Sequence, residues 1–69
     1  MNVKEYVIEN SNGWVVKNLK KWGNSVFPAN LIRNEEDVEA FEKLLSEILH
    51  NQVKLFKTEG GYICECYVN

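Results

Sequence analysis

The chain has 69 residues, of which 45% are hydrophobic and 26% charged, a balance typical of one small globular domain and not of a disordered segment. A domain this small buries only about 60% of the surface of its unfolded chain, so burial against a partner or a second copy would add stability. The formal net charge is −2, which excludes the overall basic character of a typical nucleic-acid-binding domain.

The sequence contains few residues that could bind a metal or form a disulfide. Two cysteines, Cys64 and Cys66, and one histidine, His50, cannot supply the four ligands of a zinc site, so we expect neither a metal nor another cofactor. Residues two apart on a strand are separated by about 6.5–7 Å, too far for a disulfide, and reduced thiols indicate the cytoplasm. The first nine residues include the charged Lys4, Glu5 and Glu9 and contain no long apolar run, so we expect no signal peptide and no membrane span.

Residues 6–16 predict a β-hairpin. Residues 6–8 and 14–16 are β-branched or aromatic, and the intervening Asn10–Gly13 segment tolerates positive φ. Loops centred on Ser11-Asn12 and on Asn12-Gly13 both fit, so the pattern leaves the register open. Residues 17–25 are polar and basic and end in Gly-Asn-Ser, which predicts an exposed connection.

A third strand is predicted over residues 29–32, after Pro28, because proline cannot donate a hydrogen bond to a ladder. A helix is predicted from about Glu35 to Leu49. Asn34 is a good N-cap, three acidic residues occupy the first turn, and apolar residues recur at helical spacing. We expect His50 to be a basic helix-end residue and Asn51 to adopt the left-handed stop.

A second hairpin is predicted from residues 53–57 and 62–68, joined by Thr58-Glu59-Gly60-Gly61. A loop of two or four residues pairs odd positions of the first strand with even positions of the second. Val53 and Leu55 then share one face with Cys64, Cys66 and Val68, and the other face holds a mixed set: Lys54, Phe56, Ile63, Glu65 and Tyr67.

Together these elements predict a single α+β domain spanning residues 1–69. Its order is β-β-β-α-β-β, a small antiparallel sheet with one helix packed on one face. One helix covers only one face of a sheet, so Phe56, Ile63 and Tyr67 would line an uncovered face, which Trp14 or Trp22 could extend. Aromatic residues on such a face are typical anchors of protein interfaces.

The acidic helix is a second candidate docking surface, through Glu39 and Glu42 on its solvent side. No nucleophile, base and orienting group occur together, because His50 lacks partners and the thiols face the core, so we expect no enzymatic activity and no catalytic residue. The alternative function is weak binding of single-stranded nucleic acid, for which one basic, aromatic segment is suited: Lys17, Lys20, Lys21 and Trp22.

Residues 6–16, residues 29–32 and a helix containing Glu36, Phe41 and Leu44 resemble short uncharacterised phage and prophage proteins of low-GC Gram-positive bacteria. These proteins open with a Tyr-Val-Ile-x-Asn hairpin, and the resemblance spans roughly residues 5–45. It brings no catalytic residues. It implies a protein that binds a host protein and blocks or redirects it. The uncovered sheet face would bind either such a host protein or a second copy of the chain.

Overall fold

The computed structural model describes residues 3–9 and 13–67, which form three α-helices and a three-stranded antiparallel sheet. The α+β class and the helix packed on an antiparallel sheet are confirmed. The predicted order β-β-β-α-β-β is wrong in its first half. The described elements are, in chain order, α1 (Val3–Glu9), α2 (Trp14–Trp22), β1 (Asn24–Phe27), the short 3-10 helix η1 (Ala29–Leu31), α3 (Glu35–Leu49), β2 (Gln52–Thr58) and β3 (Gly61–Tyr67).

The first predicted hairpin is replaced by helices α1 and α2, and the predicted turn at residues 10–12 lies outside the described residues. In α2, Val15, Val16 and Leu19 are buried at helical spacing, and the segment predicted as a connection forms its second half. Gly23 ends the helix in the left-handed region at φ 80°, with its N–H donating to the Leu19 carbonyl at 3.0 Å. Burial of this apolar stripe outweighs the strand preference of the valines.

The first strand lies before Pro28 and not after it. β1 ends at Phe27, and residues 29–31 form η1, so the predicted strand over residues 29–32 is wrong. Pro28 has φ −62° and lacks an N–H group, so it ends the strand at the point where the chain turns toward α3.

Helix α3 confirms the prediction at both ends. The Asn34 side chain accepts a hydrogen bond from the Asp37 N–H at 3.1 Å, and the Asp37 carboxylate accepts one from the Arg33 N–H at 2.9 Å. The left-handed stop is His50, at φ 57°, and not Asn51. None of the described helices is long and apolar enough to cross a membrane.

The sheet has the order β1-β3-β2, with β3 in the centre. In the register of the second hairpin, Val53 lies opposite Cys66 and Phe56 lies opposite Ile63, so the predicted parity is confirmed. β1 pairs with the other side of β3, where Val26 lies opposite Ile63.

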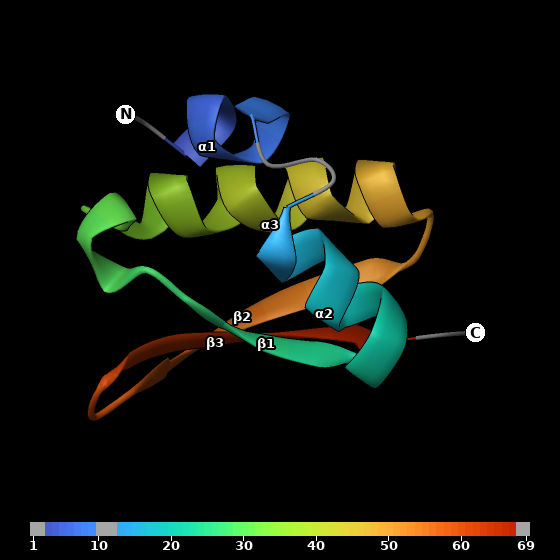
Figure 1. The fold of residues 1–69 in the computed structure, drawn as a ribbon. Helices are drawn as coiled ribbons and strands as arrows, with labels where there is room; N and C mark the ends of the chain where they lie inside the picture. The colour runs from blue at the N-terminus through green and yellow to red at the C-terminus, as the bar shows by residue number, and fades with distance from the viewer. Residues whose placement is uncertain (1–2, 10–12, 68–69) are drawn as a thin grey trace.

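The core lies between the sheet and a helical layer (Figure 1). Helix α3 packs on β2, α2 packs on β1 and β3, and α1 packs on α3. Phe41 of α3 is fully buried, with its ring centroid 3.7 Å from that of Phe27, and Tyr6 of α1 meets Phe27 edge-on at 5.6 Å. All three helices lie on the same side of the sheet, where one helix was expected, and its opposite side carries no described element.

Candidate protein-binding surface

The side of the sheet away from the helices is a continuous surface built by all three strands (Figure 1). Along β1 and along the first half of β2, buried residues that face the helices alternate with exposed residues that face away. The register adds alternate residues of β3 to the same side. We call this surface the open face and define it by six residues: Val26, Lys54, Phe56, Ile63, Glu65 and Tyr67.

An apolar row crosses the open face from edge to edge. Ile63 of β3 lies opposite Val26 on one side and opposite Phe56 on the other. Val26 is 63% exposed, Phe56 is 41% exposed and Ile63 is half-buried, while Tyr67 on the same face is 40% exposed. The structure therefore brings Phe56, Ile63 and Tyr67 to one surface, as their parity predicts.

Val26 is a member of this row that sequence reasoning missed. The predicted strand covers only residues 29–32, after Pro28, and leaves Val26 outside it. The available signal was the alternation in Ser25-Val26-Phe27, where Ser25 and Phe27 are buried and Val26 is exposed. A proline directly after such a segment is compatible with the end of an edge strand.

A charged row runs beside the apolar row. Glu65 of β3 lies opposite Lys54 of β2 on one side and opposite Asn24 of β1 on the other. The open face thus carries one cation and one anion as cross-strand neighbours, next to a band of apolar side chains. This combination suits a partner surface that is itself part apolar and part charged.

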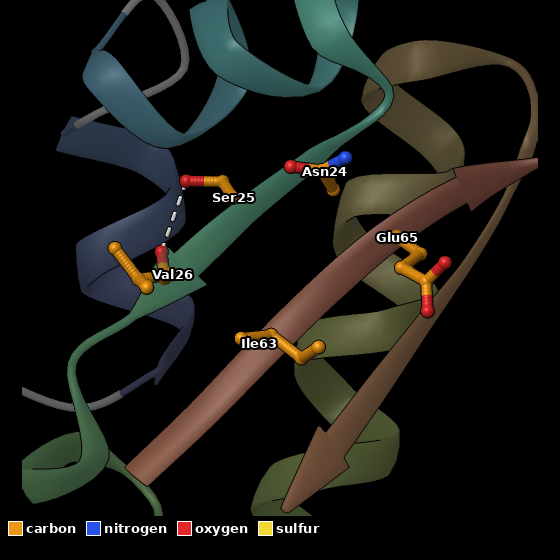
Figure 2. Close-up of a pocket in the computed structure, with 5 residues that line it drawn as sticks. All are labelled: Asn24, Ser25, Val26, Ile63 and Glu65. Atoms are coloured by element: carbon orange, nitrogen blue, oxygen red, sulfur yellow. Dashed lines mark hydrogen bonds between the residues drawn. The ribbon is translucent and has the colours of Figure 1, made fainter. Parts of the chain in front are cut away.

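A hollow of about 290 Å³ lies on the β1 side of the open face, lined by Asn24, Ser25, Val26, Ile63 and Glu65 (Figure 2). The Ser25 hydroxyl donates to the Val26 carbonyl at 3.0 Å, and pairing with β3 holds this part of the edge strand in place. A hollow at the lower limit of small-molecule pockets, about 300 Å³, is large enough for a partner side chain.

The sequence offers Trp14 or Trp22 as an extension of the open face, and the structure places both on α2. Trp14 is the first residue of α2, in the helical layer, and its ring is 43% exposed. Trp14 therefore does not join the row of Val26, Ile63 and Phe56.

The acidic helix α3 offers fewer exposed carboxylates for docking than its sequence suggests. Glu39 is exposed on α3, as expected, but Glu42 is half-buried and its Oε2 accepts a hydrogen bond from the Leu55 N–H at 2.8 Å. The Ser46 hydroxyl likewise accepts from the Val53 N–H at 3.0 Å. The expectation that Glu42 lies on the solvent side is therefore wrong, because it binds the outer edge of β2.

The basic candidates lie together on α2. Lys17, Lys20, Lys21 and Trp22 are all exposed, and the Lys21 ammonium lies 4.9 Å from the centroid of the Trp22 ring. Helical spacing of three and four residues also places Trp14, Lys17 and Lys21 along one stripe. Sequence reasoning missed Trp14 as a member of this stripe because it predicted a strand there.

The histidine and one of the two thiols line a second hollow, of about 310 Å³, between the ends of α2, α3 and β3. His50, Lys20 and Cys66 are among its lining residues. Burial raises the pKa of the Cys66 thiol and raises that of Cys64 from 9.0 to about 12. Both thiols therefore stay protonated at neutral pH, a form in which cysteine is a poor nucleophile and a poor metal ligand.

Among the residues that the structure describes, no group of three or more histidine, cysteine, aspartate or glutamate side chains could hold a metal ion. The open face and the basic stripe of α2 are the two surfaces that combine exposed aromatic rings with charge. No protein-family model, no curated protein and no solved structure matches this chain.

Proposed function

We propose that this chain is a non-enzymatic protein-binding module that recognises its partner through the open face. The observation that carries this proposal is the apolar row of Val26, Ile63 and Phe56, which crosses three strands on the side that the described helices leave uncovered. Adjacent exposed apolar side chains with a polar surround are typical of interaction sites. Phe56 and Tyr67 are of the residue type that most often anchors protein interfaces.

Two kinds of partner fit this proposal, a host protein and a second copy of the chain. The resemblance to phage and prophage proteins supports a host protein, which the module would inhibit or regulate. The free thiols of Cys64 and Cys66 support the cytoplasm as the compartment in which it acts.

Affinity capture with matched variants tests the proposal. A tagged wild-type chain is compared with Phe56→Glu and Val26→Glu, and Trp14→Glu serves as the control because Trp14 is as exposed as Phe56 but lies on α2. We expect both open-face variants to lose proteins that the wild type and the control retain, with unchanged far-UV circular dichroism. Capture of the same proteins by all four chains would refute the open face as the binding surface.

Single-stranded nucleic acid is the second candidate ligand, favoured by the stripe of Trp14, Lys17 and Lys21 with Trp22 beside it. Lysines would neutralise phosphates and the tryptophan rings would stack on bases. Binding of an oligonucleotide should quench tryptophan fluorescence at low salt, weaken as salt rises and be lost in Lys17→Glu/Lys21→Glu. Unchanged fluorescence at low salt would exclude this function.

A further inference from the structure

We propose that the partner on the open face is a second copy of this chain, packed face to face about a two-fold axis that runs parallel to the strands between β2 and β3. This inference rests on the proposed function, because it takes the open face as the binding surface and names its occupant. The order of charged and apolar residues across β2 and β3 points to this occupant.

A symmetric dimer needs a patch that is complementary to itself. A two-fold axis parallel to the strands and midway between β2 and β3 exchanges cross-strand neighbours between the copies. Each β2 residue then faces, in the second copy, the β3 residue that lies opposite it in its own sheet. Lys54 therefore faces Glu65 of the second copy, and Phe56 faces Ile63 of the second copy.

The charges of the open face favour an axis between β2 and β3 over an axis along β3. Lys54 and Glu65 from both copies form a square in which every adjacent pair has opposite charge. An axis along β3 would instead place Glu65 on Glu65 of the second copy, with like charges in contact. A face built for a strongly acidic or strongly basic partner would carry one sign of charge, and this face carries one of each.

The edges of the sheet are poorly suited to joining a second copy side by side. Ser46 and Glu42 of α3 accept the outward N–H groups of Val53 and Leu55, so the first half of the β2 edge is already hydrogen-bonded. On β1, the Cys66 N–H donates to the Gly23 carbonyl at 2.8 Å, and alternation directs the N–H groups of Asn24 and Val26 outward. The next outward position is Pro28, which has no N–H, so the free edge is two donors long.

The size of the face sets the expected affinity. β2 and β3 pair over seven residues, and the proposed axis brings only these two strands of each copy face to face, with β1 outside the overlap. The overlapping face is therefore about 23 Å long and about 10 Å wide. Such a face is well below the roughly 800 Å² per partner of a standard stable interface. We therefore expect a dimer that dissociates on dilution, with a Kd in the micromolar range or weaker.

Sedimentation equilibrium of the full chain at concentrations from about 5 μM to 1 mM tests the inference, with charge variants as probes. Lys54→Glu and Glu65→Lys place like charges opposite each other twice per dimer, and each should weaken association at least tenfold. An equimolar mixture of these two variants should restore dimerisation to near the wild-type value, because every facing pair is again of opposite sign. The double variant Lys54→Glu/Glu65→Lys should dimerise like the wild type and controls for loss of fold.

Three results would overturn the inference: a wild type that stays monomeric at 1 mM, charge variants that dimerise like the wild type, or a mixture that does not form a heterodimer. The proposed function fails separately. A monomeric wild type whose captured protein is lost in Phe56→Glu and retained in Trp14→Glu would leave the open face as a binding surface with a different occupant.

Discussion

Replacing Glu42 by alanine should destabilise the fold, whereas replacing Glu39, one turn earlier on the same helix, should not. Glu42 Oε2 accepts the Leu55 N–H at 2.8 Å, on the outer edge of β2, where none of the described strands offers an acceptor. A hydrogen bond to a charged group contributes about 1.5–3 kcal/mol to the free energy of unfolding. Water can reach this partly buried edge and replace the carboxylate, so we expect a loss of about 1.5 kcal/mol.

This loss of unfolding free energy in Glu42→Ala lowers the melting temperature. At about 2.1 cal/mol/K per residue, the unfolding entropy of a 69-residue chain is about 0.14 kcal/mol/K, so the expected decrease in Tm is about 10 °C. Thermal unfolding followed by circular dichroism measures it. Glu42→Gln retains an acceptor oxygen without the charge and should lie between wild type and Glu42→Ala.

Glu39→Ala is the matched control, because Glu39 is exposed on the same helix and alanine is the better helix former. Its Tm should equal or slightly exceed that of the wild type. If the two alanine variants melt within about 2 °C of each other, the hydrogen bond to Leu55 contributes little to the fold and the reasoning is refuted.

Three further predictions concern the core, the helix end and pH. Phe41→Ala should cost about 3–5 kcal/mol, most of the stability of so small a domain, because Phe41 is fully buried against Phe27; an unchanged urea midpoint would contradict this. His50→Gly should raise the free energy of unfolding by about 0.5–1 kcal/mol, since glycine adopts the left-handed φ of 57° without a Cβ clash. A lower melting temperature would show that the His50 side chain stabilises the fold. The pKa of Cys64 rises from 9.0 to about 12 on folding, so the unfolded chain loses this proton first and stability should fall from about pH 9 to about pH 12. Denaturant titrations across this range should show a smaller fall in Cys64→Ala, and equal falls in both proteins would contradict the assignment.

The second half of the fold could be predicted from local sequence because its signals agree with each other. Asn34, the acidic first turn and the apolar spacing all indicate the same helix, and the two-residue turn Glu59-Gly60 fixes the parity of the hairpin. Parity alone then placed Phe56 and Ile63 together on the open face.

The first half of the fold could not be predicted because its residues prefer strands, yet burying their apolar side chains against the sheet favours helices. Val15 and Val16 prefer strands, but with Leu19 they form the apolar stripe of α2 against the sheet. Gly23 follows a last turn that contains Lys20 and Lys21, a pattern typical of a helix end, but the Gly-Asn-Ser sequence also predicts a turn in a connection. The role of Glu42 could not be predicted either, since its acceptor function depends on how α3 lies along the edge of β2.

The central position of β3 has a consequence for how the chain is made. β1 and β2 each pair only with β3, and the register joins Asn24 to Glu65 across most of the sequence. Translation therefore produces β1 and β2 before β3, the strand with which both of them pair. During that interval the apolar faces of α2 and α3 have no sheet to pack against. Folding of the described domain accordingly follows translation of β3, and a nascent chain arrested before Gly61 exposes the side chains that later become its core.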